Sequence, residues 1–364
     1  MQTFHCDHCQ ALLFFESTQC LTCGHVLAFL PDLNRIAALE QSDGDQWRRV
    51  GDRPDGPAYR LCANYSGAQV CNWALRAGEP QPLCISCRLT TVIPNLEVAG
   101  HQQAWAKLER AKRRMLYTLR ALGCPVRNRS EDGERGLAYQ FLAPLPEGPK
   151  VLTGHDKGVI TVNIAEADDA TREAQRNKLH EPYRTLLGHF RHEIGHYYWM
   201  LLIEGGARLA ACREVFGDES VDYAAALRKH YDTGAPAGWE EHYISAYAAS
   251  HPWEDWAESW AHYMHMFDVL ETAADNGLKL EPPRHDEPSL RQARADGGVS
   301  FDELLRNWFP VTFVLNNLNR SMGLPDGYPF VLSDEVIGKL RFIHATIREA
   351  RQSRAPAAAA NAAG

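Results

Sequence analysis

The sequence predicts an α+β protein, with a small β-rich N-terminal region followed by a mainly helical domain that contains a small sheet. Eight of the ten cysteines lie before residue 88, and residues 1–97 are short runs broken by Gly, Pro, Asn and Asp, which is typical of loops and short strands. From residue 101 onward, apolar residues recur at helical spacing over long segments. The chain is 45% hydrophobic and 23% charged, an ordinary composition for a globular protein with a buried core.

Net charge and hydropathy argue against several classes of function. The 38 basic and 46 acidic side chains give a net charge of -8, so no global positive field would hold nucleic acid or an anionic membrane. The N-terminus lacks a basic segment followed by an apolar run, and no window approaches the ~18 uninterrupted apolar residues of a spanning helix. We therefore expect a cytoplasmic protein with no membrane partner. In a reducing compartment, clustered cysteines bind metal more often than they form disulfides.

The first cysteines form two C-x2-C pairs separated by ten residues. Each pair is a tight turn that presents two thiolates, and the gap lets a hairpin return the second pair to the first. We expect four of these residues to close a tetrahedral structural zinc site: Cys6, Cys9, Cys20 and Cys23. The alternative is that some of the thiols are free, or that His5, His8 or His25 replaces one of them.

A second, looser set of cysteines predicts another structural zinc site by the same logic. It consists of Cys62, Cys71, Cys84 and Cys87. A full thiolate shell leaves no open coordination position, so neither set is expected to be catalytic. In a region of such short runs, we expect metal to replace a hydrophobic core.

The connection between the two halves contains one clear helix and one clear strand. Residues 101–122 have apolar positions at helical spacing and end at Gly123, a helix stop signal. Residues 158–164 alternate like a half-buried strand, which either lies in the core or offers an edge to an extended peptide. The predicted organisation is a cysteine-rich region at 1–97, a bridging helix and linker at 98–150, a second domain at 151–350 and a disordered tail at 351–364.

The sequence His192-Glu193-Ile194-Gly195-His196 is an HExxH motif. It lies in a helix predicted over residues 181–202, which has an apolar back face. Two histidines four residues apart on a helix point the same way, so their imidazoles can hold one Zn²⁺. Glu193 lies beside them, where it can reach an attacking water. The alternative is that His192 and His196 are ordinary packed histidines.

A catalytic zinc needs a third protein ligand and one open position. No third histidine follows the motif at the usual short spacing, which favours a glutamate. A helix predicted over 252–274 carries Glu254, Glu258 and His262 on one face. We expect Glu254 to bind the metal, with Glu258 as the alternative; the other carboxylate, and His262, would support the site by hydrogen bonds to the ligands. An acidic residue in the first helical turn is also favoured without any metal.

Together these motifs resemble the bacterial zinc-binding metallopeptidases that carry an N-terminal zinc ribbon. The resemblance rests on the two C-x2-C pairs (the knuckles, residues 6–9 and 20–23), on HEIGH and on HPWEDWAESWAHYMH. It covers roughly residues 1–350. More distantly, YAASHPWEDWAE resembles the Y-x6-E-x3-E arrangement of lethal-factor-like gluzincins. This similarity implies a zincin-like domain in which Glu254 binds zinc, Glu258 supports it and Tyr247 donates a hydrogen bond to the oxyanion. Trp256 and Trp260 depart from the pattern, since other residues are common there.

The expected activity is zinc-assisted hydrolysis of a peptide bond, with Glu193 as the general base and with peptides or proteins as substrates. The expected cofactor is Zn²⁺, as one catalytic ion and one or two structural ions. One alternative keeps the hydrolase but replaces the peptide with another amide or an ester.

The other alternative is a binding module, in which the zinc ribbons dock a protein or a nucleic acid and the hydrolase half is inactive or regulatory. Local basic residues support this alternative: Arg48, Arg49, Arg53, Arg60 and the cluster from Arg110 to Arg114. A solvated helix face is the simpler interpretation of Lys112-Arg113-Arg114.

Overall fold

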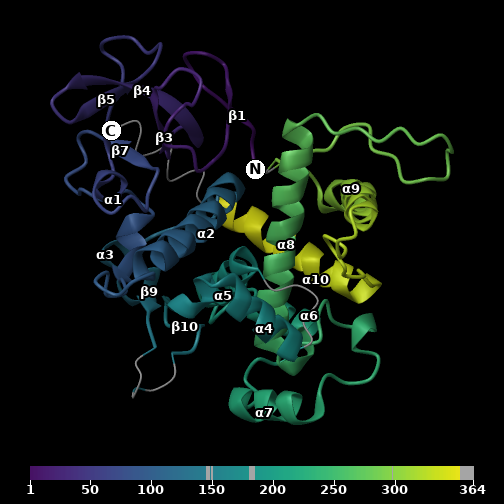
Figure 1. The fold of residues 1–364 in the computed structure, drawn as a ribbon. Coiled ribbons are helices and arrows are strands. Elements are labelled where there is room, and N and C mark those ends of the chain that lie inside the picture. Colours follow the sequence, from purple (N-terminus) through teal and green to yellow (C-terminus); the bar gives the residue numbers. More distant parts are fainter. Residues whose placement is uncertain (145–147, 149–150, 180–184, 297, 353–364) are drawn as a thin grey trace.

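The computed structural model describes residues 1–144, 148, 151–179, 185–296 and 298–352. Figure 1 shows a strand-rich N-terminal region at the upper left and, below and to its right, helices arranged around the long helix α8 (Pro252–Asp275). The segments that connect these parts are the helix α2 (His101–Leu122) and a small second sheet.

The N-terminal region contains a short hairpin and a five-stranded antiparallel meander. β1 pairs with β2, and the meander has the order β3-β4-β5-β6-β7. β3 also contacts the residue just before β7, since Phe29 in β3 forms a parallel bridge with Trp73. The strands are β1 (Phe4–His5), β2 (Leu12–Leu13), β3 (Val26–Leu30), β4 (Arg35–Asp43), β5 (Gln46–Arg49), β6 (Ala58–Leu61) and β7 (Ala74–Arg76).

Both faces of the meander are buried. One face forms a small cluster with Leu30, Leu39 and Tyr59, whereas residues of alternate register such as Leu27 and Phe29 join the main core of the molecule. The expectation that metal replaces a hydrophobic core here is therefore wrong. Each run is short in the sequence, but pairing five of them gives a sheet with enough apolar surface to bury.

The second sheet has the strand order β10-β11-β9-β8. The strand predicted at 158–164 is β11, and it is flanked by β10 on one side and β9 on the other. The interpretation of this strand as a peptide-binding edge is therefore wrong, and the edge next to it belongs to β10. The strands are β8 (Thr90–Val92), β9 (Ala138–Leu142), β10 (Gly154–Asp156) and β11 (Val159–Asn163). β8 comes from the cysteine-rich side of residue 97, so both parts of the chain build this sheet.

α2 has the predicted bounds and ends at Gly123, whose φ of 75° is left-handed. Its Tyr117 ring packs against Phe4, Phe15 and Phe29 of the N-terminal region. Because α2 also packs on α5 (Leu186–Leu202), one continuous core joins the N-terminal region to the helical part.

α5 and α8 cross closely at Gly195. A Cβ at this position would lie 3.0 Å from Ala257 Cα and 3.1 Å from Trp260 Cβ, so the crossing depends on glycine. Trp256 Nε1 donates a hydrogen bond to the Gly195 carbonyl at 2.9 Å. The two departures from the gluzincin pattern, Trp256 and Trp260, are fully buried and support this crossing.

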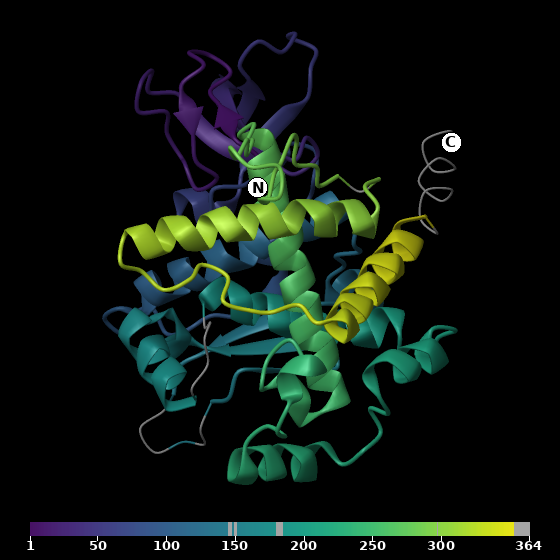
Figure 2. The same ribbon diagram turned by 90° about the vertical axis from the view of Figure 1, so that its right-hand side faces the viewer.

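Two long C-terminal helices complete the packing around α8. These are α9 (Phe301–Ser321), which crosses in front of α8 in Figure 2, and α10 (Asp334–Gln352). The remaining helical elements are short: α1 (Ala63–Ser66), α3 (Arg129–Asp132), α4 (Asp169–Leu179), α6 (Leu209–Phe216), α7 (Tyr223–Thr233), η1 (Cys87–Leu89), η2 (Gly133–Arg135), η3 (Ile164–Ala167), η4 (Trp239–Glu241) and η5 (Ala248–Ser250).

Two predicted segments differ from the structure at their ends. The helix predicted over 181–202 begins at Leu186, because Thr185 is extended (φ -110°, ψ 155°) and its side chain caps the Gly188 N–H; residues 180–184 lie outside the described part. The first two residues of the predicted tail, Arg351 and Gln352, belong to α10. Residues 353–364 of that tail are not described.

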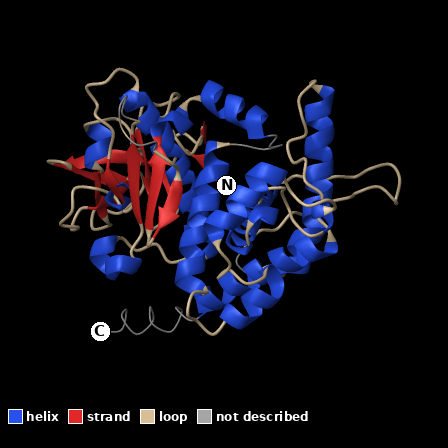
Figure 3. Ribbon diagram, turned by 90° about the horizontal axis from the view of Figure 1, so that it is seen from below, coloured by secondary structure: helices blue, strands red, loops and turns tan. Residues whose placement is uncertain are grey.

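Viewed from below in Figure 3, the strands gather on one side and most helices on the other. The predicted α+β class, with a β-rich N-terminal region and a mostly helical part that carries a small sheet, is confirmed. Within the described ranges, no helix combines the length and the apolar character that crossing a bilayer requires.

Candidate active site and metal centres

The HExxH residues lie in the middle of α5, on the side that faces α8. His192 and His196 are one helical turn apart, and their Nε2 atoms lie 3.2 Å from each other. His196 is buried, and His192 is half-buried. The helix therefore presents two imidazole nitrogens toward one point, as the motif predicts.

α8 brings a carboxylate to the same point. Glu254 is 1% exposed, and its Oε2 lies 2.9 Å from His192 Nε2 and 3.4 Å from His196 Nε2. Bonds of 2.0–2.1 Å in a tetrahedron separate the ligand atoms of a zinc ion by about 3.3 Å. The spacing of these three donor atoms thus fits a zinc ion.

Glu258 lies on the other side of the His192 ring. Its Oε1 accepts a hydrogen bond from His192 Nδ1 at 2.7 Å, and its Oε2 accepts one from Ser245 Oγ at 2.7 Å. Because a carboxylate only accepts, this contact places a proton on Nδ1 and turns Nε2 toward the metal position. Burial raises the pKa of Glu258, but the hydrogen bonds from His192 and Ser245 and the charges of the nearby imidazoles together lower it to about 2. Glu254 thus has the geometry of a metal ligand, and Glu258 that of a support for His192.

The electrostatics of this pocket favour a positive charge. Burial lowers the pKa of His192, yet hydrogen bonds to Glu254 and Glu258 raise it well above its ordinary value. Burial raises the pKa of Glu254, yet the charges of the two imidazoles bring it well below its usual range. A cation is therefore the group that the pocket stabilises.

His262, predicted to support the ligands, lies further along α8. Its Nδ1 forms a 2.8 Å hydrogen bond with Tyr328 Oη. Burial lowers the pKa of His262 to about 4, which keeps it neutral. Its link to the site is the charge of Glu258, and it does not belong to the cluster of three donors.

Glu193 is half-buried beside the donor set. Its Oε2 has no hydrogen-bond partner among the described residues. Burial raises the pKa of Glu193, and the nearby imidazoles partly offset that effect. A carboxylate in this position, with one oxygen unengaged, is suited to accept a proton.

Two tyrosines from the segment between α5 and α8 contact this site. The Tyr247 ring lies 5.9 Å from the His192 ring, and burial raises the pKa of Tyr247, which keeps its hydroxyl protonated. Tyr223, at the start of α7, donates a 2.6 Å hydrogen bond to Glu254 Oε1. Tyr223 was not among the predicted site residues. It lies 31 residues before its partner, and no local pattern marks it.

Ring contacts connect the donor set to the edge strand β10. The Trp253 ring lies 3.9 Å from the His196 ring. The ring of His155, in β10, stacks on the His196 ring with a centroid distance of 6.5 Å. His155 Nε2 accepts a hydrogen bond from the Gly158 N–H at 3.0 Å. Burial lowers the pKa of His155 to about 3, so it is neutral. The site therefore lies directly beside an edge of the second sheet.

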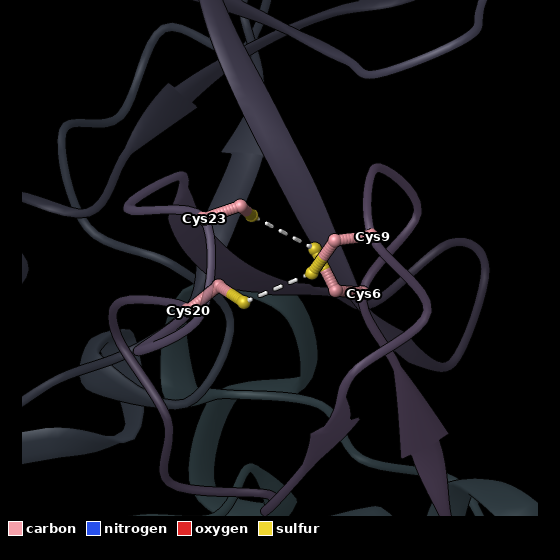
Figure 4. A group of neighbouring side chains, drawn as sticks. All are labelled: Cys6, Cys9, Cys20 and Cys23. Carbon is pink, nitrogen blue, oxygen red and sulfur yellow. Dashed lines mark hydrogen bonds between the residues drawn. The ribbon is translucent and has the colours of Figure 1, made fainter.

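The first cysteine tetrad is assembled by the two knuckles, as shown in Figure 4. Cys6 Sγ lies 3.6 Å from Cys23 Sγ, and Cys9 Sγ lies 3.6 Å from Cys20 Sγ. Zn–S bonds of 2.3 Å place tetrahedral sulfurs about 3.8 Å apart, so the four thiols fit one zinc ion. Cys9 and Cys23 are partly exposed.

The second tetrad has the same arrangement in a buried setting. All four of its sulfurs lie within 4.8 Å of one another: Cys62, Cys71, Cys84 and Cys87. Two backbone N–H groups donate to them, from Trp73 to Cys71 Sγ at 3.4 Å and from Cys84 to Cys62 Sγ at 3.3 Å. This set also fits one zinc ion.

The prediction that Lys112-Arg113-Arg114 form a solvated helix face is wrong for Lys112 and Arg113. Lys112 is fully buried and pairs with Glu109 at 2.9 Å, and Arg113 is 5% exposed. Burial lowers the pKa of Arg113, but the negative charges of Cys71 and Glu109 raise it overall. Arg113 therefore supplies positive charge to the second tetrad, which the sequence pattern did not reveal.

Most of the other basic residues named above form ion pairs or hydrogen bonds with other residues of the protein. Arg114 pairs with Glu16, Arg49 pairs with Asp7, and Arg48 and Arg60 donate to backbone carbonyls. Arg53 and Arg110 are exposed. The region thus presents few free cations for a phosphate backbone.

Comparison with known proteins gives matches to two families and to full-length relatives. The family described as "Putative zinc-binding metallo-peptidase" matches residues 101–346, and a zinc-ribbon domain family matches residues 3–98. Uncharacterized proteins of Mycobacterium bovis and Mycobacterium tuberculosis are 42% identical to the chain over 358 residues, which is 98% of each protein. No solved structure matches the chain.

Proposed function

Since the chain belongs to this zinc-binding metallo-peptidase family, we propose that it is a zinc-dependent peptidase with an active centre at the crossing of α5 and α8. His192, His196 and Glu254 would hold the metal. The observation that carries the proposal is the spacing of their three donor atoms, at 2.9, 3.2 and 3.4 Å, with a half-buried Glu193 beside them.

Glu193 is the proposed general base. A zinc ion at this site supplies Lewis acidity, which polarises a scissile carbonyl and acidifies water. Glu193 Oε2 takes a proton from the attacking water and later passes it to the leaving amine. Burial raises the pKa of this carboxylate, which makes it a better proton acceptor than an exposed glutamate.

The two tyrosines have different proposed roles. Tyr247 is the proposed donor to the oxyanion, because its hydroxyl stays protonated and its ring lies against His192. Tyr223 holds Glu254 by its second oxygen, Oε1, so that Oε2 faces the imidazoles. This division assigns the oxyanion to one phenol and the orientation of the metal ligand to the other.

A peptide is the substrate class that the surroundings favour. β10 is the edge of its sheet and packs against α5, so an extended chain that adds to β10 would pass the donor set. A cavity of about 520 Å³ borders this strand and is lined by Thr153, His155 and Asp156, among others. A small ester or amide would not need such an edge.

The test combines metal content with cleavage of a peptide library. We expect Glu193→Gln to keep its metal and to lose at least about 100-fold in turnover, since general base catalysis contributes that much. Glu254→Ala should lose one zinc ion per chain. The matched control is Glu214→Gln on the exposed face of α6, which should change neither quantity.

The proposal would be overturned by full cleavage activity in Glu193→Gln. If Glu258→Ala loses the metal while Glu254→Ala retains it, the ligand assignment is reversed. If the wild type cleaves no peptide but is retained on DNA or RNA in a salt-dependent way, the binding-module alternative is correct.

A further inference from the structure

A second group of metal-binding side chains lies on the rim of the first cysteine tetrad. Each knuckle contributes one histidine beside its last cysteine: His8 precedes Cys9, and His25 follows Cys23 after a single glycine. That glycine, Gly24, has a φ of 78°. The left-handed turn brings the His25 ring back onto the sulfur of Cys23.

The contacts in this group are those of potential ligands of one ion. His25 Nδ1 lies 3.3 Å from Cys23 Sγ, and the His8 and His25 rings are stacked with their centroids 4.3 Å apart. Donor atoms of His8, Cys23 and His25 all lie within 4.8 Å of one another. Zn–N and Zn–S bonds at a tetrahedral angle separate N and S by about 3.5 Å, close to the observed 3.3 Å.

The charge of the tetrad favours a further cation at this place. Four thiolates around one Zn²⁺ carry a net charge of -2. Beside the second tetrad, the buried Arg113 supplies a positive charge, because its Nη1 donates a 2.6 Å hydrogen bond to the carbonyl of Val70, the residue before Cys71. At the first tetrad, the half-exposed His25 contacts a sulfur instead. Its Nε2 lies 3.6 Å from Glu40 Oε1, a carboxylate that can orient a metal-bound imidazole.

We propose that His8, His25 and Cys23 form an additional, exchangeable zinc site, in which the Cys23 sulfur is shared with the ion of the first tetrad. Thiolate and imidazole are the ligand types that zinc prefers. The site is weaker than the tetrads, because it has three protein ligands, one of them shared, and because His8 is exposed. It lies in the ribbon and does not depend on the proposed peptidase activity.

The experiment measures zinc per chain in the full-length protein at a series of buffered free zinc concentrations. We expect the wild type to bind about one more zinc ion than His8→Ala at high free zinc, and the two proteins to be equal at low free zinc. His5→Ala, which removes an exposed histidine outside this group, should behave like the wild type. Equal zinc content in wild type and His8→Ala at every concentration would overturn the proposal.

A second measurement tests the shared sulfur. Co²⁺ added to the zinc-loaded protein should give a sulfur-to-cobalt charge-transfer band if the added ion binds Cys23. We expect this band in the wild type and in His5→Ala, and its loss in His8→Ala. A band of equal strength in His8→Ala would show that cobalt replaces zinc in a tetrad, which contradicts the additional site.

Discussion

Glu254 is constrained from both sides of its carboxylate. Oε2 faces His192 and His196, while Oε1 accepts the hydrogen bond from Tyr223. The side chain is 1% exposed, so water competes little for either oxygen. A carboxylate held in this way offers one oxygen in a fixed direction, and outer hydrogen bonds of this kind are as much a part of a metal site as its ligands.

We therefore predict that Tyr223→Phe weakens the affinity of the active-site metal by about 10–100-fold, the usual effect of removing such a support. Competition with a chelator of known affinity measures this change. Tyr231→Phe, on the exposed side of the same helix, is the matched control and should leave the affinity unaltered. Wild-type affinity in Tyr223→Phe would mean that Glu254 is oriented by its packing alone.

The crossing of α5 and α8 depends on the absence of a side chain at Gly195. We predict that Gly195→Ala lowers the free energy of unfolding by about 1–3 kcal/mol, because its Cβ would meet Ala257 and Trp260 at 3.0–3.2 Å and force the helices apart. Urea unfolding measures the change.

Gly338 in α10 provides the control for this substitution, since a Cβ there meets nothing within 4 Å. Gly338→Ala should stabilise the protein by up to about 1 kcal/mol, because alanine is the better helix former. If both substitutions stabilise, the close contact at Gly195 does not limit the helix crossing.

The packing of α10 on α8 predicts a dependence of stability on pH. His344 in α10 shares a 2.9 Å hydrogen bond with Tyr263 in α8, and burial lowers the pKa of His344 to about 4. In the unfolded chain, histidine has a pKa of about 6.5. As the pH falls from about 6.5 toward 4, the unfolded state binds a proton that the folded state does not, so the free energy of unfolding decreases.

This pH dependence can be assigned by comparing wild type with His344→Gln in urea unfolding at several pH values. We expect a shallower decrease in the variant between pH 6.5 and 4, because the substituted residue does not titrate. His262, whose pKa is also lowered to about 4, contributes equally to both proteins. Parallel curves would show that His344 does not contribute.

The N-terminal region and the helical part share one hydrophobic core. Tyr117 of α2 packs against Phe4, Phe15 and Phe29, and β8 extends the second sheet from the N-terminal side. The two family matches meet between residues 98 and 101, but the packing continues across that point. The ribbon is thus a structural part of the helical unit.

We predict that a protein lacking residues 1–98 does not fold cooperatively, because the buried face of α2 and the edge of β9 become exposed to water. Near-ultraviolet circular dichroism and thermal unfolding measure this loss. A sharp unfolding transition in the shortened protein, together with one bound zinc ion, would contradict the prediction and establish the helical part as an independent domain.

Local signals account for the parts of this molecule that could be predicted. The helix at 101–122 was predicted with correct bounds and the one at 252–274 to within a residue of its end, because apolar spacing, Gly123 and Pro252 are signals within each segment. The C-x2-C pairs and HExxH likewise fix their own geometry over a few residues. The five-stranded meander was not predicted, because short strands gain their stability from partners elsewhere in the chain.

The identity of the candidate ligands, the cysteine tetrads and the principal helices follows from the order of the residues, since each depends on spacings of two to four positions. Packing in three dimensions established that Glu254 faces the imidazoles while Glu258 supports His192 from behind, although both lie on the same helical face. It also brought the Tyr223 hydroxyl into hydrogen-bond contact with Glu254, and it buried Lys112 and Arg113. These contacts join segments tens of residues apart, and the free energy that selects them comes from burial and charge pairing, which no local pattern records.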